Sequence, residues 1–415
     1  MSSSAAPVAA DDAPLPIPNL ALPQLAFVLS EPKAEQPREG AQEKLLQGIQ
    51  NDEMAPYLEA LTTAHVLPPQ PELLSTLQQK NKDELARIDA KLDDAKTNLG
   101  ETEVSDALRD KAAYLARIGE KDAAVKAHEE AFSKTAGKGT KIDLVLSIIR
   151  IGFFHSDHDL ISTSIDRAQK LVDEGGDWDR RNRLKVYEGL YSLSIRNFNK
   201  GAELLLDAMP TFTATELIEY DDFVTLCVLA GVFAFERKDI KNKVRCASFL
   251  LALIRNLTSL DASLQIIDAP EVIAVIPNVP SLKDFYDSLY KCDYATFFRS
   301  LAAVESAHLL PSRLLAVHAR YYVRELRIKA YAQLLESYRS VTLESLAAAF
   351  GVSKEWLDAD LARFIAASRL TCSIDRVHGV VETHRPDAKN ARYAAVIKQG
   401  DAVLTSVQRL SRVIG

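Results

Sequence analysis

The chain is poor in residues that break helices and in residues that build covalent or metal staples. Its 415 residues include only 16 glycines and 17 prolines, which favours long helices over a turn-rich β fold. The four cysteines, Cys227, Cys246, Cys292 and Cys372, are scattered and form no C-x-x-C pair. They indicate reduced thiols in a cytosolic or nuclear protein rather than a disulfide framework.

Three further features are missing at a larger scale. No apolar run approaches the roughly 18–20 residues that a membrane span needs, so no membrane partner is expected. The N-terminal residues carry Asp11, Asp12 and several prolines instead of the basic and apolar pattern of a secretory signal. Excess positive charge is also missing, because the net charge is −7. This balance argues against a chain whose main task is to bind nucleic acid through its phosphates.

What the sequence does contain is helical periodicity. From Pro71 to Leu99 the chain is polar, but one row of residues recurs at spacings of three and four, with Asn81 in one place of that row. Its apolar members are Leu74, Leu77, Leu85, Ile88, Leu92, Ala95 and Leu99. The row predicts one long amphipathic helix, and it is too short and interrupted to favour a self-pairing coiled coil.

A repeat follows this helix. Small or polar turns end at Asp122, Asp159, Asn199 and Asp239, so that the steps between them are 37, 40 and 40 residues. Each turn lies between two apolar helical runs. A period near forty residues made of helix, turn and helix is typical of a TPR-like solenoid, which presents extended surfaces to other proteins. The alternative is a generic helical domain in which the spacing is coincidental.

The pattern changes after residue 323. Thr342 is expected to cap a short helix over 343–350, and Ser353 is expected to cap the next helix, which begins at Lys354. Two β-like runs follow at 370–374 and 378–383. Three helices, a glycine turn and a β-hairpin make the layout of a winged helix, a relative of helix-turn-helix.

Many winged helices read DNA, so this alternative has to be weighed. The third helix offers Lys354 and Arg363 against Glu355, Asp358 and Asp360, and it contains no Asn or Gln. A helix that reads bases needs basic and amide side chains that face the groove. We therefore expect the module to pack against proteins and not to bind nucleic acid.

The last predicted helix covers about 390–413. Residues of one row recur at spacings of three and four, as in a coiled-coil seam: Tyr393, Val396, Gly400, Val403, Val407, Leu410 and Ile414. The row predicts either docking on partner helices or packing on the chain's own winged helix, and the sequence leaves both open.

A TPR-like array that leads into a winged helix and then a terminal helix resembles the PCI-domain family, which scaffolds the proteasome lid, the signalosome and a translation initiation complex. Five strings sharpen the resemblance to a PCI subunit of the proteasome lid, and the signalosome subunit is the main alternative. The strings are GGDWDRRNRLK at 175–185, SLYKCDY at 288–294, RYYVRE at 320–325, AYAQLLESY at 330–338 and IKQGD at 397–401.

The resemblance implies a fold and a role. The fold is predominantly all-α: a TPR-like solenoid at 20–310, the winged-helix part of a PCI domain at 311–386 and a terminal bundle helix at 387–415. Residues 1–19 are expected to form a disordered tail. The implied role is a non-catalytic scaffold in a hetero-oligomer of the cytoplasm and nucleus. Its implied partners are the other PCI subunits of the lid, the lid deubiquitinase and the ATPase base subunits.

Three groups of residues are candidates for contact with these partners. Trp356, Leu357 and Leu361 lie on or near the face of the third winged-helix helix, where a place in the core is the alternative. Val380 and Val381 belong to a wing strand that is expected to have an open edge for a neighbour's strand. Val403, Val407 and Leu410 belong to the terminal row.

No residue is predicted to be catalytic, to bind a cofactor or to bind a metal. The segment from His155 to Asp159 places two histidines three residues apart, but it falls at a repeat turn, and a closed zinc site usually has four protein ligands. A metallohydrolase built on this turn is therefore the weaker alternative.

Overall fold

The computed structural model describes residues 16–30, 40–98, 100–235, 279, 281–384 and 388–414. Its contacts divide the chain into two compact units, Met1–Asp287 with Ser300–Val323, and Ser288–Arg299 with Arg324–Gly415. The described helices of the first part of the chain are α1 (Ala21–Ser30), α2 (Ala41–Asn51), α3 (Ala55–Thr63), α4 (Pro71–Asn98), α5 (Glu101–Ile118), α6 (Lys121–Lys134), α7 (Lys138–His155), α8 (His158–Asp173), α9 (Trp178–Ser194), α10 (Phe198–Ala208) and α11 (Tyr220–Ala234).

The later elements contain the only described strands. They are α16 (Leu282–Lys291), α17 (Tyr294–Val304), α18 (Ala319–Leu335), β1 (Ser340–Thr342), α19 (Leu343–Phe350), α20 (Lys354–Ala366), β2 (Cys372–Asp375), β3 (Val380–Thr383) and α21 (Ala388–Ile414). The prediction of a predominantly helical chain with one small sheet is confirmed. No helix among the described residues is both long enough and apolar enough to cross a membrane.

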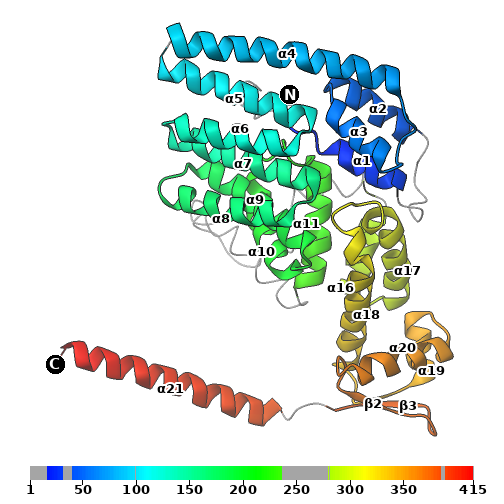
Figure 1. Ribbon diagram of the computed structural model, residues 1–415. Coiled ribbons are helices and arrows are strands. Elements are labelled where there is room, and N and C mark those ends of the chain that lie inside the picture. Colours follow the sequence, from blue (N-terminus) through cyan, green and yellow to red (C-terminus); the bar gives the residue numbers. More distant parts are fainter. Residues whose placement is uncertain are drawn as a thin grey trace, which may run out of the picture. The chain divides into compact units, whose positions relative to one another are not determined.

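Helices α4 to α11 stack in chain order, each against the next (Figure 1). Three of their turns share one backbone device, a residue in the left-handed region: Gly119 at φ 80°, Ser156 at φ 56° and Arg196 at φ 68°. These positions lie 37 and 40 residues apart (119, 156 and 196), so the predicted repeat is confirmed over this stretch. The predicted turn at 237–239 lies outside the described residues.

Side-chain caps start the second helix of two of these pairs. The Asp157 carboxylate accepts from the backbone N–H groups of Asp159 and Leu160, and the Asn197 side chain accepts from that of Lys200. Such caps satisfy donors that have no partner within the helix. The polar residues at the end of each turn in the sequence therefore lie at the start of a helix.

One helix pair was not recognised as a repeat from the sequence. Between α16 and α17, Cys292 has φ 63°, and the Asp293 carboxylate accepts from the Thr296 backbone N–H at 3.3 Å. This is the same turn device as at 156–157, although its left-handed residue is a cysteine. The pair follows residues 236–278, so no count of repeats led to it.

The long amphipathic helix is confirmed as α4. Its buried residues are Leu77, Asn81, Ile88, Leu92 and Ala95, which are members of the predicted row. Asn81 occupies an apolar place because its side-chain oxygen accepts a hydrogen bond from the Tyr114 hydroxyl of α5 at 3.2 Å. A buried amide with a partner avoids the desolvation cost of an unpaired one.

The three strands form one antiparallel sheet in the order β1-β3-β2. The two strands expected from the sequence are present as β2 and β3. Strand β1 was missed because it is only three residues long and runs directly into α19. Its Val341 pairs with Val381 of β3.

Candidate protein interface

The winged helix is positioned by the caps that the sequence predicted. The Thr342 hydroxyl accepts from the Ser345 N–H at 3.3 Å, and the Ser353 hydroxyl accepts from the Trp356 N–H at 3.4 Å. Gly351 ends α19 at φ 64°, a conformation that glycine adopts without strain. Together these residues fix where α20 begins, and so which of its side chains face inward.

Helix α20 is tied to α18 by a buried polar group. The Asp360 carboxylate is buried, lies 3.3 Å from Nη1 of Arg327 through both oxygens, and accepts from the Tyr331 hydroxyl at 3.2 Å. Burial raises the pKa of Tyr331 far above its ordinary range, and the Asp360 charge adds to this effect, so the hydroxyl stays a donor. A buried charge of this kind is tolerated only with partners, and it fixes the rotation of α20 against α18.

The structure separates the three residues predicted on α20. Leu357 and Leu361 are both 0% exposed, which places them in the core of the winged helix, the alternative that the sequence left open. Trp356 is 42% exposed. Its ring packs against Phe298 in a T-shaped arrangement, and its ring centroid lies 5.6 Å from the guanidinium of Arg327. These two contacts fix the position of the exposed indole.

The expectation of an open edge at Val380 and Val381 is wrong. Strand β3 is the central strand, paired with β1 on one side and β2 on the other. Val381 is 0% exposed and Val380 is half-buried, because β1 supplies the third strand that the sequence did not reveal. The free edges of the sheet belong to β1 and β2.

Three basic side chains near the start of α20 and in the hairpin contact carboxylates. Lys354 Nζ lies 2.9 Å from Glu344, and Arg376 lies 3.0 Å from Asp358. The His378 side chain contacts Asp375, whose pKa is lowered by that hydrogen bond. Pairing of this kind reduces the positive field that a phosphate backbone would meet.

Helix α21 exposes its apolar row. Seven large apolar side chains are between 58% and 67% exposed: Tyr393, Val396, Ile397, Val403, Leu404, Val407 and Leu410. The three predicted contact residues of this helix are among them. An apolar stripe of this length in water is the kind of surface that another protein covers.

The other tryptophan of the chain is also exposed and was not nominated from the sequence. Trp178, the first residue of α9, is 63% exposed within the string GGDWDRR. Local structure explains the two glycines of this string. Gly175 has φ 136°, and a Cβ on Gly176 would lie 2.9 Å from Cα of Val172. The sequence signals for Trp178 were its place in a polar turn and in one of the strings that carry the family resemblance.

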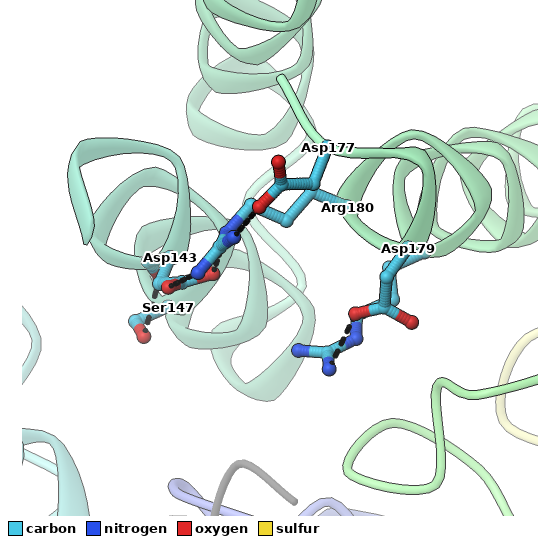
Figure 2. A network of polar contacts seen from close by, with 6 residues as sticks. Asp143, Ser147, Asp177, Asp179 and Arg180 are labelled. Carbon is cyan, nitrogen blue, oxygen red and sulfur yellow. Dashed lines mark hydrogen bonds and ion pairs between the residues drawn. The ribbon is translucent and has the colours of Figure 1, made fainter. Parts of the chain in front are cut away.

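The neighbours of Trp178 are fixed by ion pairs (Figure 2). Arg180 reaches from α9 to Asp143 of α7, with Nε–Oδ1 at 2.9 Å and Nη2–Oδ2 at 2.7 Å, while its Nη1 lies 2.6 Å from Asp177. The hydrogen bonding to Asp143, together with the charges of Asp143, Asp177 and Asp179, raises the pKa of the guanidinium. Asp179 pairs with Arg183 one turn further along at 2.7 Å. These ion pairs therefore hold the backbone of the turn in place, and the exposed side chain of Trp178 is attached to that fixed backbone.

The histidine turn has internal partners as well. Asp157 accepts a hydrogen bond from Lys121 Nζ at 2.6 Å, which together with the cap lowers the pKa of the carboxyl. Burial lowers the pKa of His155 to about 4. No group of three or more metal-ligating side chains comes together in the described part of the chain.

The sequence of this chain matches known proteins along almost its whole length. Family models match at residues 70–243 (26S proteasome subunit RPN7), 293–385 (PCI domain) and 392–414 (26S proteasome regulatory subunit RPN7/PSMD6 C-terminal helix). The 26S proteasome non-ATPase regulatory subunit 6 of Oryza sativa subsp. japonica is 44% identical over 398 residues, covering 96% of both chains. The 26S proteasome regulatory subunit rpn7 of Schizosaccharomyces pombe is 39% identical over 405 residues, again covering 96% of both.

The chain belongs to the family of 26S proteasome non-ATPase regulatory subunit 6. The predicted resemblance to a PCI subunit of the proteasome lid is thereby confirmed. The signalosome alternative is represented by COP9 signalosome complex subunit 1 of Arabidopsis thaliana. That protein is 24% identical over 221 residues, covering 53% of this chain and 45% of the relative. The match is shorter and weaker than the matches to proteasome subunits.

The candidate surfaces lie within the regions that match the family models. The match at 70–243 contains Trp178 and its bracing ion pairs, the PCI match contains α20 and the sheet, and the terminal match lies within α21. Helix α21 thus has a family model of its own, which is separate from that of the winged helix.

Proposed function

We propose that this chain is a non-catalytic scaffold subunit of the proteasome regulatory lid, which supports lid assembly and ubiquitin-dependent protein degradation through protein–protein contacts. One observation carries the proposal most: the apolar row of α21 is exposed along a helix that matches the C-terminal helix of the family. Helices with such rows associate by packing them against each other.

The proposed partners are the other PCI subunits of the lid, the lid deubiquitinase and the ATPase base subunits, in a hetero-oligomer of the cytoplasm and nucleus. Val403, Val407 and Leu410 would enter a bundle with partner helices. Trp356 would contact a neighbouring winged helix. Since β3 is central, strand addition would use a free edge of β1 or β2, with Val380 and Val381 holding the sheet together from within.

Affinity purification of the tagged full-length chain from its own cells, followed by mass spectrometry, tests the proposal. We expect lid and ATPase subunits in comparable amounts with the wild-type chain. Leu410→Asp places a charge in the apolar row and is expected to remove these subunits, because a buried unpaired charge is costly. Thr405→Asp is the matched control, since it adds the same charge to an exposed position on the face of α21 opposite the row and should leave recovery unchanged.

Other outcomes would redirect the assignment. Recovery of signalosome subunits would move the chain to that complex and keep the scaffold role. Salt-sensitive recovery of nucleic acid with no proteasome subunits would favour the winged helix as a nucleic-acid reader. Normal incorporation of the Leu410→Asp chain would show that the row of α21 is not a contact surface.

A further inference from the structure

The segment Pro311–Tyr322 lies in the first unit and is anchored at its start to the first described helix. The Gln24 side chain of α1 donates to the Pro311 carbonyl at 2.5 Å and accepts from the Arg313 backbone N–H at 2.9 Å. Within the segment, Leu315 and Ala316 N–H donate to the Ser312 carbonyl, Ala316–His318 form a short 3-10 helix, and Ala319–Tyr322 are the first turn of α18. The residues before this first turn therefore depend on other elements for much of their hydrogen bonding.

Its first long side chain ends on helix α7. The guanidinium of Arg313 donates through Nη1 to the Phe154 carbonyl at 3.0 Å and through Nη2 to the Phe153 carbonyl. These carbonyls belong to the last turn of α7, where backbone acceptors carry partial negative charge, and that of Phe153 also accepts from the backbone N–H of the cap residue Ser156 at 3.4 Å. Burial lowers the pKa of Arg313, so the helix end has to compensate a cation that has left water.

Two more side chains of the same segment reach the next helices in the stack. His318 Nε2 lies 2.8 Å from the carbonyl of Ser194, the last residue of α9. The Tyr322 hydroxyl donates to the Leu229 carbonyl of α11 at 2.8 Å. Arg313, His318 and Tyr322 thus meet α7, α9 and α11 in chain order.

Aromatic side chains also pack close to the contacts that His318 and Tyr322 make. Phe198, the first residue of α10, lies 5.7 Å from Tyr322 and 6.3 Å from Tyr321, measured between ring centroids. Phe233 of α11 lies 5.5 Å from Tyr322. The segment is consequently packed against the helices and not only hydrogen-bonded to them.

We propose that Pro311–Tyr322 is a strap that joins the C-terminal ends of α7 and α9 to the C-terminal half of α11 as one cooperative element. One short segment carries all three contacts, so loss of one contact frees backbone that positions the other two. The ends of α7 and α9 and the C-terminal half of α11 then open together when the strap lifts, and each is protected by contacts that lie far from it in sequence. The strap is a conformational lock of the solenoid and is independent of the proposed function.

Hydrogen exchange measured by mass spectrometry on the full chain tests the strap. Arg313→Met keeps an apolar stem and removes the two bonds to α7. We expect exchange at 153–158 to be faster by about tenfold or more, as for loss of hydrogen bonds from a charged group. The decisive peptides are 194–198 and 229–235, which Arg313 does not contact and which should also exchange faster.

Two further variants make the result decisive. Arg320→Met removes the same charge from an exposed position in the first turn of α18, and it should change none of these peptides. Tyr322→Phe removes a single hydroxyl, and it should speed exchange at 229–235 and also at 153–158. It decides the question if Arg313→Met does not fold. Acceleration that stays at the helix end next to each substitution would overturn the strap, as would no acceleration at all.

Discussion

Helices α7 and α21 are both rich in apolar residues, yet α7 buries most of its apolar side chains and α21 exposes its apolar row. Eleven of the eighteen residues of α7 are buried, so it has no wide polar face and packs against α6, α8 and α9. Helix α21 concentrates its apolar residues in one narrow row and leaves that row exposed. The pattern of apolar residues, more than their number, tells whether a helix belongs to the core of its own chain or to an assembly.

The first and largest test of this comparison truncates one aliphatic side chain in each helix. Ile149 of α7 is 0% exposed, so Ile149→Ala leaves a cavity and should lower the free energy of unfolding by about 2–5 kcal/mol. Leu410→Ala on α21 should change it by less than about 0.5 kcal/mol in the free chain. Urea denaturation followed by fluorescence in a Trp356→Phe background, where Trp178 in the same unit as α7 is the one remaining tryptophan, measures the first value.

Circular dichroism at 222 nm during the same denaturation measures the second value. Equal losses in the two variants would mean that α21 is buried in the free chain. The contrast between α7 and α21 would then not be one between a helix buried in the core of its own chain and a helix that is buried only in an assembly.

The second test uses one glycine in each helix, where the same change should have opposite signs. A Cβ on Gly152 of α7 would lie 2.6 Å from Cγ1 of Ile161, so Gly152→Ala should destabilise the solenoid by about 1–3 kcal/mol through overpacking. A Cβ on Gly400 of α21 would meet nothing within 4 Å. Gly400→Ala should therefore raise helix stability by about 0.5–1 kcal/mol.

Thermal unfolding monitored by circular dichroism gives both signs. A melting temperature that falls in the Gly400→Ala chain would show that α21 has a close neighbour at this position. A Gly152→Ala chain of unchanged stability would show that α7 and α8 have room to separate.

Much of this architecture was predictable because local signals agreed with the fold. The repeat was visible as polar turn ends, and the structure explains them through the caps at Asp157 and Asn197. The caps at Thr342 and Ser353 were predictable for the same reason, since hydroxyl side chains satisfy the free N–H groups of a helix start. These features depend on residues only a few positions apart.

What could not be predicted depends on residues far apart in the chain. Strand β1 is too short to show a period, and its existence rests on pairing with Val381 some forty residues later (381 − 341). That pairing turned the expected edge strand into a central one. Likewise, nothing local distinguishes Leu357 from Trp356 as core or surface until Asp360 is paired with Arg327 and sets the rotation of α20.

The last test uses a buried histidine of the solenoid, because the sequence of α21 contains no histidine. Burial, with a smaller contribution from the charge of Arg150, lowers the pKa of His128 from 6.5 to about 4. Between these values the unfolded chain binds a proton that the folded chain does not. Stability due to this group is therefore complete above pH 6.5 and is lost as the pH falls toward 4.

Acidification from about pH 7.5 to 5.5 should lower the free energy of unfolding of the solenoid by about 1 kcal/mol through His128 alone. His128→Gln should remove that part of the pH dependence, whatever its effect on stability at neutral pH. His158→Gln, an exposed histidine in the same unit, controls for the loss of a surface histidine. Urea titrations of the three chains at both pH values measure the slopes. An unchanged slope in His128→Gln would mean that its imidazole gains a proton in the folded solenoid as readily as in the unfolded chain.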